Sequence, residues 1–477
     1  MTLKFRRFLY TFFILLFLVL GPLLIIYARG YRFDLARQRV VKTGGLSIDS
    51  TPRNAQVYLN GTYTEPNWIE RRFVIFKTLF GMRKMGGNTP AIFQNLIPDS
   101  YQIIVEKPDY HTWTKKIEIY PEQVAFLENI YLFLNQPTSS TIGTWNNIDS
   151  AWPSDDNRSL AFSYFQNNQW HIALGDLARE QVSVIYSSPF KPSDCLWNNG
   201  SSRLLLTFAN RLPILLDLKN NSALTDFTLQ NLKSLTWSVD NPDLLYAASN
   251  LSIDSFNAKT QTLEPSVDLS ALNIKRIYSL AAHDNQLWLL TLSTDNRGQL
   301  ISVKSNSQAP RVILTDLSEP QNYSFRGWHD DILLLYNNSK SGLLAVNTSP
   351  SVSESARLTE IFARGWSWQG DSPRLLYWDQ FELGILTFDL KNEYQPAKQE
   401  ILSRYSQPLT NAIWFGDYNY VIFNLNGSLR YLEIDNRNHR NTDTLLAFGV
   451  SDSLLTASDP GSIFVLSAST LYKIRLQ

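Results

Sequence analysis

The sequence predicts a mainly β protein with one membrane-spanning helix at its amino-terminal end. Three observations support this class. Residues 8–28 form an uncharged apolar run, and residues 44–136 contain short stretches that alternate between apolar and polar side chains. From about residue 145, a pattern of tryptophan, turn and leucine-rich strand recurs to the end. A chain of 477 residues is too long for one ordinary core, so several units are expected.

The first predicted element is a transmembrane helix over residues 8–28, preceded by a cytoplasmic tail over residues 1–7. The run has no charged side chain. At about 1.5 Å per residue it matches a hydrocarbon core of roughly 30 Å. A signal peptide cleaved at Ala28 is the alternative, but its apolar region is usually only about 7–15 residues long. The sequence therefore favours an uncleaved, single-pass anchor in the cell membrane.

Charge is unevenly distributed along the chain. Residues 1–137 contain 17 Lys and Arg against 10 Asp and Glu, and the remainder contains 26 against 33. Residues 29–43 are expected to form a basic linker, so the charge bias does not favour the amino-terminal side as the cytoplasmic one. We still expect a cytoplasmic amino terminus and an extracytoplasmic bulk, because one early span before a long β region fits export. The excess of basic residues in residues 1–137 indicates that this part of the chain lies at an anionic lipid surface. No nucleic-acid partner is expected.

Residues 44–136 are predicted to form a small β domain. Leu46 and Ile48 alternate with polar residues, and the alternation resumes at Ala55, Val57 and Leu59 after a turn at residues 51–54. A second turn is expected at Asn60-Gly61, because both residues tolerate positive φ. The last strands are expected over residues 111–134, and residues 136–141 are predicted to be a linker.

This region resembles the PEGA domain, a small β module of prokaryotic surface proteins named for a Pro-Glu-Gly-Ala motif. The motif reads Pro52-Arg53-Asn54-Ala55 here, with Asn where the family has Gly. Further similarity lies at Thr89-Pro90, residues 95–101, residues 103–105 and Pro108-Asp109-Tyr110, with Asp99 and Asp109 in place of the usual Gly. The resemblance implies a β-sandwich of a bacterial membrane or surface protein, without a catalytic site.

The chain departs from the family pattern by an insertion at residues 62–88. Aromatic and aliphatic residues recur there at helical spacing, and basic residues accompany them. One interpretation is an amphipathic helix that contacts the membrane or a partner, and the other is an arm packed on its own domain. The residues expected to make the contact are Trp68, Arg71, Arg72, Phe76, Lys77, Phe80, Arg83 and Lys84.

From about residue 145, the sequence repeats a unit of roughly 40–45 residues. In each copy an inner strand ends near a tryptophan, the chain turns at Asp or Gly, and an apolar strand follows. The clear copies contain Trp152, Trp197, Trp237, Trp328, Trp368 and Trp414. Weaker copies at residues 287–303 and 463–474 fill the gaps.

Short strands at this period predict a β-propeller over residues 137–477, with eight blades expected and seven as the alternative. The last copy is irregular, so its closing strand is expected to come from elsewhere in the chain. The pattern is more similar to TolB-type and WD40-like blades than to true WD40 repeats, because the His and Trp-Asp signatures are absent. The equivalent positions of Trp237 and Trp368 predict that both are buried.

No catalytic, cofactor-binding or metal site is predicted. The five histidines contain no i,i+4 pair, and no phosphate loop, nucleophile elbow or calcium loop appears. His329-Asp330-Asp331 is a candidate metal or acid–base cluster, but its place at the turn of a repeat is explained by turn formation. Cys195 is the single cysteine, so no intramolecular disulfide is possible. We expect it to be a buried apolar residue.

These features predict a non-enzymatic, membrane-anchored cell-surface protein whose propeller binds an envelope protein or glycan. An enzyme is one alternative, because propellers also carry hydrolases and lyases with sites at the channel mouth. The other alternative is a structural role in envelope assembly, in which propellers pack against copies of themselves.

Overall fold

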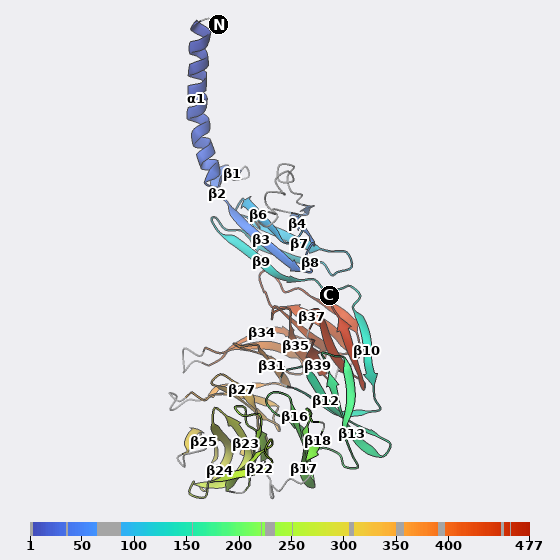
Figure 1. Ribbon diagram of the computed structural model, residues 1–477. Coiled ribbons are helices and arrows are strands. Elements are labelled where there is room, and N and C mark those ends of the chain that lie inside the picture. The colour runs from blue at the N-terminus through green and yellow to red at the C-terminus, as the bar shows by residue number, and fades with distance from the viewer. Residues whose placement is uncertain are drawn as a thin grey trace. The chain divides into compact units, whose positions relative to one another are not determined.

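The structure is a computed structural model with two compact units (Figure 1). The first unit contains Met1–Pro137, Tyr431–Leu445 and Leu476–Gln477, and the second contains Thr138–Arg430 and Leu446–Arg475. The residues that the structure describes are 3–34, 37–63, 87–154, 156–220, 222–224, 234–249, 251–304, 310–349, 357–389, 396–449, 453–457 and 459–477.

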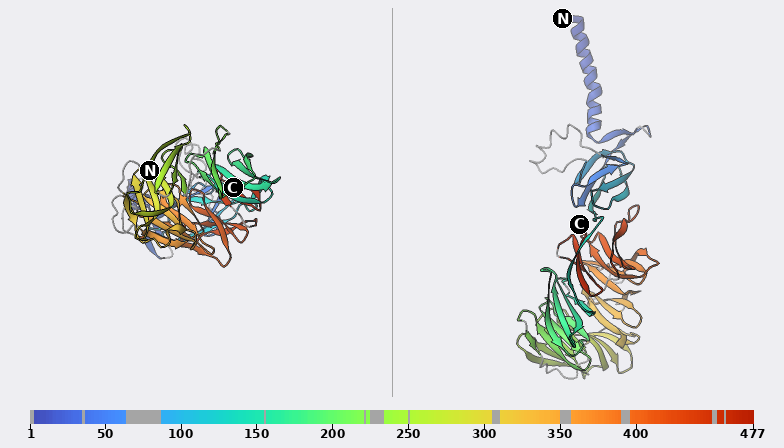
Figure 2. Two further views of the ribbon diagram at one scale, coloured as in Figure 1. Left: turned by 90° about the horizontal axis from the view of Figure 1, so that it is seen from below. Right: turned by 90° about the vertical axis from the view of Figure 1, so that its right-hand side faces the viewer.

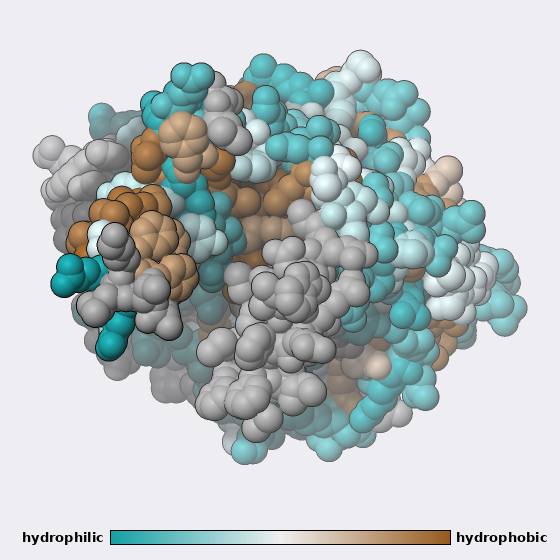
Figure 3. Space-filling view, turned by 90° about the horizontal axis from the view of Figure 1, so that it is seen from above, coloured by the Kyte–Doolittle hydropathy of each residue, from teal (hydrophilic) through white to brown (hydrophobic). Residues whose placement is uncertain are grey.

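The first unit begins with helix α1 (Leu3–Ala28). Within the described residues, its segment Phe5–Ala28 is the one helix long and apolar enough to cross a membrane, with a mean hydropathy of 2.7. The most apolar stretch of this segment is not buried in the protein. Figure 3 shows hydrophobic side chains gathered around the end of this helix that faces the viewer. This helix lies where the sequence predicts the membrane anchor.

A short β-hairpin follows the helix, in the segment that the sequence predicts as a linker. It consists of β1 (Tyr31–Asp34) and β2 (Arg39–Lys42), which pair antiparallel. Its strands have four residues each and mix charged with aromatic or aliphatic residues, so no long apolar pattern marks them. The hairpin leads into the first strand of the β domain.

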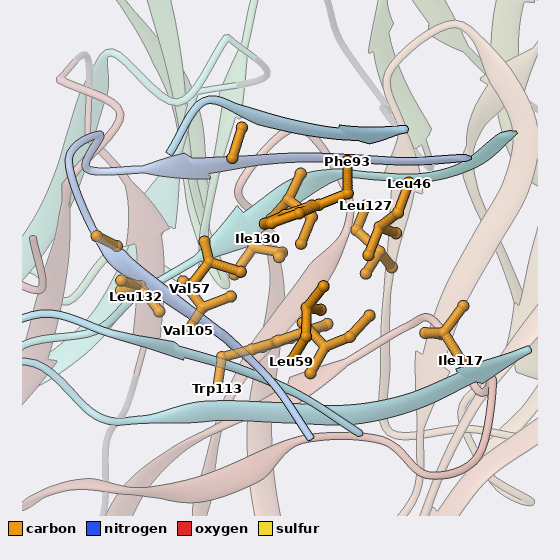
Figure 4. Packing of buried hydrophobic residues seen from close by; sticks show 14 of the residues in the cluster. Leu46, Val57, Leu59, Phe93, Val105, Trp113, Ile117, Leu127, Ile130 and Leu132 are labelled. Atoms are coloured by element: carbon orange, nitrogen blue, oxygen red, sulfur yellow. The ribbon is translucent and has the colours of Figure 1, made fainter. Parts of the chain in front are cut away.

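The β domain is a sandwich of two sheets around one core. One sheet has the order β6 (Ala91–Leu96), β3 (Gly44–Thr51), β9 (Val124–Tyr131), and the other has the order β5 (Thr62–Tyr63), β4 (Gln56–Leu59), β7 (Ser100–Glu106), β8 (Trp113–Glu118). Strand β9 runs parallel to β3, and the other pairs are antiparallel. Figure 4 shows how side chains of both sheets meet, with Leu46 and Leu127 from one and Val105 and Trp113 from the other. The alternation of the sequence thus buries one face of each sheet.

The turns of this sandwich have the backbone conformations that their residue types favour. Asn60 and Gly61 both have positive φ and form the two-residue connection between Leu59 and Thr62, which pair across the hairpin. Asn54 and Asp109 have φ of 65° and 69°. Asn and Asp tolerate this left-handed region better than other residues with a Cβ, which explains their use at these turns.

A buried ion pair lies within the first unit. The Lys115 side chain is fully buried, and its Nζ lies 2.9 Å from Glu433 Oε2 and 3.2 Å from Asp435 Oδ2. Glu433 also accepts hydrogen bonds from Trp113 Nε1 at 3.2 Å and from Asn441 Nδ2 at 2.7 Å. The buried charges of Lys115 and Glu433 are therefore paired and hydrogen-bonded, as burial requires.

The same environment lowers the pKa of the Asp435 carboxyl group. Burial opposes its ionisation, but hydrogen bonds from Arg437 and the positive charges of Lys115 and Arg437 outweigh this effect and lower its pKa. Arg437 Nε lies 2.9 Å from Asp435 Oδ2 and also donates to Asp435 Oδ1. Asp435 is thus held in its charged form beside Lys115.

The described strands from residue 138 onward form eight four-stranded sheets. The first four contain β11 (Ile148–Pro153), β12 (Ser159–Gln166), β13 (Gln169–Asp176), β14 (Gln181–Ser188); β15 (Asp194–Trp197), β16 (Arg203–Phe208), β17 (Arg211–Asp217), β18 (Ser222–Leu224); β19 (Ser234–Trp237), β20 (Leu244–Ala248), β21 (Ser252–Asn257), β22 (Thr262–Asp268); and β23 (Ile274–His283), β24 (Gln286–Ser293), β25 (Gly298–Lys304), β26 (Arg311–Leu314).

After the short helix η1 (Pro320–Asn322), three further sheets follow in sequence order. They contain β27 (Tyr323–His329), β28 (Ile332–Asn337), β29 (Gly342–Asn347), β30 (Arg357–Phe362); β31 (Gly365–Gln369), β32 (Ser372–Trp378), β33 (Glu382–Thr387), β34 (Lys398–Arg404); and β35 (Leu409–Phe415), β36 (Tyr420–Leu425), β37 (Ser428–Glu433), β38 (Thr442–Ala447).

The eighth sheet joins the start of the second unit to its end. Its order is β10 (Thr138–Thr144), β41 (Thr470–Arg475), β40 (Ser462–Ser467), β39 (Ser453–Thr456). Strands from the two ends of this unit lie side by side in Figures 1 and 2. The predicted linker at residues 136–141 is therefore wrong, because Thr138 to Thr141 pair with β41. The closing strand that the irregular last repeat was expected to take from elsewhere in the chain is β10.

First strands of successive sheets lie next to each other, as for β15 with β19, β19 with β23 and β35 with β39. A β-propeller consists of successive four-stranded sheets whose first strands are adjacent, and its last sheet combines strands from both ends of the domain. The predicted strands at residues 204–206, 333–335 and 463–466 lie in β16, β28 and β40. The mainly β class and the propeller are therefore both found in the structure.

Several of the repeated tryptophans join one sheet to the preceding one. The indole N–H of Trp197 donates to the carbonyl of Trp152 at 3.0 Å, Trp237 to Leu196 at 3.1 Å, and Trp414 to Ser367 at 3.0 Å.

The predicted equivalence of Trp237 and Trp368 is wrong in one respect. Trp237 is buried, whereas Trp368 is only half-buried and stacks on His329, with ring centroids 4.3 Å apart.

Candidate binding pocket

A pocket of about 520 Å³ lies against four successive first strands of the propeller. Its wall is formed by β15, β19, β23 and β27, and the β16–β17 hairpin adds residues from one side. This volume is within the range of ordinary ligand sites, roughly 300–1,000 Å³. Since each strand begins a different sheet, the pocket exists only when these sheets are assembled.

The charged groups of the pocket are two arginines and one aspartate, Arg211, Arg326 and Asp194. The Arg211 guanidinium lies 4.0 Å from the ring centroid of Phe190, and that of Arg326 lies 5.5 Å from the ring centroid of Tyr336. Both arginines are exposed, and neither has a carboxylate partner within 4 Å among the described residues. The pocket therefore presents two guanidinium groups that are supported by aromatic rings and available to an anion.

Polar side chains hold the strands of the wall in place. Ser234 Oγ of β19 accepts the backbone N–H of Leu280 in β23 at 3.1 Å. Asn338 Nδ2 donates to the carbonyl of Asn322 at 3.2 Å, beside β27. The Ser234 bond joins wall strands of two neighbouring sheets, and the Asn338 bond lies at one end of the β27–β28 pair.

Apolar side chains line the remainder of the pocket. Phe208, Phe325, Leu196 and Leu235 contribute to the lining, and each is half-buried. A ligand that fills the pocket would therefore contact apolar surface as well as the two guanidinium groups. Apolar lining with a few placed polar groups is the usual composition of a binding site.

The predicted contact residues of the insertion lie outside the described residues. These are Trp68, Arg71, Arg72, Phe76, Lys77, Phe80, Arg83 and Lys84. At the borders of this segment, Thr62 and Tyr63 form β5, and Val57 donates its backbone N–H to the carbonyl of Gly87 at 3.1 Å. The membrane or partner contact of the insertion stays a prediction.

The candidate cluster His329-Asp330-Asp331 has the features of a turn. His329 pairs with Ile332 across the hairpin, and Asp330 has a φ of 49°. The His329 ring stacks on Trp368, and His283 stacks in the same way on Trp328 at 4.8 Å. Among the described residues, no three His, Cys, Asp or Glu side chains are grouped so that they could hold a metal ion.

Cys195 is predicted to resist thiol reagents in the folded protein. Its side chain is 5 % exposed, and burial, followed by the charge of Asp194, raises the pKa of the thiol. Since the thiolate is the reactive form, maleimide labelling should be negligible before unfolding and complete after it. Mass spectrometry of the labelled chain would measure this, and rapid labelling of the folded chain would contradict the burial of Cys195.

The two arginines of the pocket were not predicted from the sequence. Neither belongs to a motif, and they lie on strands of different sheets. A regular repeat does suggest that residues near the starts of first and third strands, which run in the same direction, share one end of a propeller. This signal indicates a region and gives no reason to choose Arg211 or Arg326 within it.

No protein-family model matches the sequence, and no curated protein matches it significantly. Solved structures with a similar fold include the Dos1 propeller, at 11 % identity and a TM-score of 0.46, which covers 71 % of this chain and 94 % of that one. The WD40 domain of SCAP from fission yeast has 10 % identity and a TM-score of 0.43, and covers 71 % and 98 %. Porphyromonas gingivalis dipeptidyl peptidase 4 has 12 % identity and a TM-score of 0.42, and covers 73 % and 58 %. The propeller assignment therefore rests on the arrangement of the sheets themselves.

Proposed function

We propose that this protein is a membrane-anchored, non-enzymatic binding protein of the cell surface. In this proposal α1 is the single-pass anchor, the PEGA-like sandwich follows it, and an eight-bladed propeller binds an acidic segment of a protein partner. The observation that carries the proposal is the pocket on four first strands, which presents the guanidinium groups of Arg211 and Arg326, neither with a carboxylate partner within 4 Å in the part of the chain that the structure describes.

The chemistry of the pocket favours a carboxylate-bearing ligand. A guanidinium group can donate two parallel hydrogen bonds to one carboxylate, and such charge-assisted bonds are stronger than neutral ones. Contact with Phe190 and Tyr336 restricts the two arginine side chains before the ligand arrives, so less conformational entropy is lost on binding. Phe208 and Phe325 supply apolar surface beside the charges, which suits a peptide with mixed side chains.

The topology of the anchor also belongs to this proposal. A cytoplasmic amino terminus places the sandwich and the propeller outside the cytoplasm, where the propeller can reach partners of the envelope. The length of α1 and the exposure of its apolar residues support the anchor. The eight four-stranded sheets support the number of blades.

Binding of a fluorescein-labelled hexaglutamate peptide to the full chain in detergent tests the proposal. A hydrogen bond to a charged group contributes about 1.5–3 kcal/mol, so Arg211→Gln and Arg326→Gln should each weaken binding by about tenfold or more. Fluorescence anisotropy measures the affinity, which should also fall as salt increases. Arg179→Gln is the matched control, because Arg179 is an exposed arginine of the same unit that does not line the pocket.

Three outcomes would contradict this function. Equal binding of hexaglutamate and hexaserine, or equal affinity of the wild type and both pocket variants, would show that the arginines do not recognise an acidic segment. Tighter, arginine-dependent binding of an acidic oligosaccharide such as oligogalacturonate would replace the protein partner by a glycan.

A further inference from the structure

The β1–β2 hairpin presents apolar side chains to solvent directly after the membrane helix. Phe33 and Val40 pair across the two strands, and they are 54 % and 58 % exposed. Because side chains alternate along a strand, Tyr31 and Lys42 lie on the same face, and Lys42 Nζ is 5.6 Å from the Tyr31 ring centroid. This face therefore combines two exposed apolar side chains with an aromatic and a basic one.

The hairpin is tied to the end of α1. Arg32 Nη1 donates to the carbonyl of Tyr27 at 2.9 Å, and its guanidinium lies 3.5 Å from the centroid of the Tyr27 ring. Figure 1 shows β1 and β2 beside the end of this helix. Only Arg29 and Gly30 separate Ala28 from the first strand. The hairpin is thus held at the carboxyl-terminal end of α1.

Basic residues lie along the hairpin beside the apolar face, and Arg39, which pairs with Asp34, points to the opposite face from Phe33 and Val40. Arg29, Arg37 and Arg39 are exposed, and the single acidic residue of the hairpin, Asp34, is 4 % exposed and lies 3.4 Å from Arg37 Nη1. Lys42 pairs with Glu122. Arg29 and Arg39 have no carboxylate partner within 4 Å among the described residues, so the hairpin presents net positive charge.

We propose that the β1–β2 hairpin lies in the headgroup region of the membrane that α1 spans, with Phe33 and Val40 inserted at the edge of the acyl chains and Arg29 and Arg39 on anionic headgroups. This inference rests on the proposed anchor. An aromatic residue at the end of a span and basic residues beside it are the usual composition at a membrane surface. Exposed apolar side chains gain from burial at the same depth.

The position of the hairpin directly after α1 indicates that lipid headgroups are what covers this face. Since α1 ends three residues before Tyr31, an extended chain could move the strand no more than about 10 Å from the helix end. The interfacial layer on each side of a hydrocarbon core of roughly 30 Å is several ångströms thick, within a total of about 40–45 Å. The hairpin therefore begins within reach of the headgroups wherever the helix ends at the lipid boundary.

Depth-dependent quenching in proteoliposomes of phosphatidylcholine and phosphatidylglycerol tests this placement. The full chain carries Cys195→Ala, and an environment-sensitive NBD label is attached at a new cysteine in place of Phe33. Nitroxide lipids quench the label from near the headgroup or from near the chain end. We expect the label to be quenched mainly by the shallow nitroxide and its emission to shift to the blue.

Two other label sites serve as controls. Leu16→Cys lies within α1 and should be quenched mainly by the deep nitroxide. Phe362→Cys, at a residue that is 73 % exposed in the second unit, should be quenched by neither. An unquenched label at position 33 with a quenched label at position 16 would overturn the hairpin placement while leaving the anchor. Unquenched labels at both positions would overturn the anchor itself.

The charge contribution is tested with the same label. Arg29→Gln and Arg39→Gln should each reduce the ratio of inserted to exposed hairpin about fivefold in anionic vesicles, and should have no effect in neutral ones. Arg53→Gln is the matched control, because Arg53 is an exposed arginine of the same unit that pairs with Asp49. Equal quenching of all three variants and the parent in anionic vesicles would show that headgroup charge does not hold the hairpin.

Discussion

Replacing Trp237 by Ala should lower the free energy of unfolding of the second unit by about 3–5 kcal/mol. The side chain is 6 % exposed and lies between two sheets, against Leu205 and Leu215 of one and Leu245 of the next. Its removal leaves a cavity between the sheets and leaves the carbonyl of Leu196 without the indole donor. Both losses act at the contact on which the propeller depends.

Scanning calorimetry of the full chain in detergent micelles would measure this loss. The matched control is Phe362→Ala, which removes an exposed aromatic side chain of the same unit and should change stability by no more than about 0.5 kcal/mol. Trp237→Phe should fall between them, because it retains apolar volume without the N–H donor. If the Trp237 and Phe362 variants unfolded alike, Trp237 would not be a contact between sheets.

Replacing Lys115 by Met should destabilise the first unit by about 3–5 kcal/mol, the usual cost of removing one partner from a buried ion pair. Glu433 would remain buried, with hydrogen bonds from Trp113 and Asn441 but without a cation. The new side chain is apolar and of similar length, so the loss would report the unpaired carboxylate more than lost packing.

A second substitution separates charge from packing at this site. Glu433→Gln in the Lys115→Met background should restore much of the stability, because the amide oxygen can still accept from Trp113 while no buried charge remains. Lys116→Met changes the exposed neighbour on the same strand and should have little effect. Chemical unfolding followed by fluorescence would measure all three. A double variant no more stable than Lys115→Met would show that Lys115 acts through packing.

The closing strand shows why part of the propeller could not be predicted. Residues 138–144 are Ser, Thr and Gly apart from one isoleucine, and most of β10 is exposed. An outer strand with both faces near solvent needs no apolar alternation, so its sequence resembles a linker. Its pairing with β41 is decided by the need of the last sheet for a fourth strand.

The pocket could not be predicted for a different reason. Arg211 and Arg326 are single residues on strands of two sheets, and no local pattern relates them. Lys115 is a similar case, because alternation within β8 predicts an inward-pointing side chain but gives no partner for its charge. Glu433 and Asp435 come from residues far along the chain. The insertion at residues 62–88, for which the sequence leaves a membrane or partner contact and a self-packed arm open, lies mostly outside the described residues.

The sequence by itself determined the elements whose signal is local. The apolar run sets α1, the alternation of Leu46 and Ile48 sets the inner face of β3, and Asn60-Gly61 sets the hairpin turn, because chain geometry relates each of these residues to its near neighbours. Only the tertiary structure decided which strand closes the last sheet, where Lys115 finds its carboxylates and which arginines share a pocket. Those contacts depend on residues that are distant in the chain, and they form only when the burial of apolar faces brings separate sheets together.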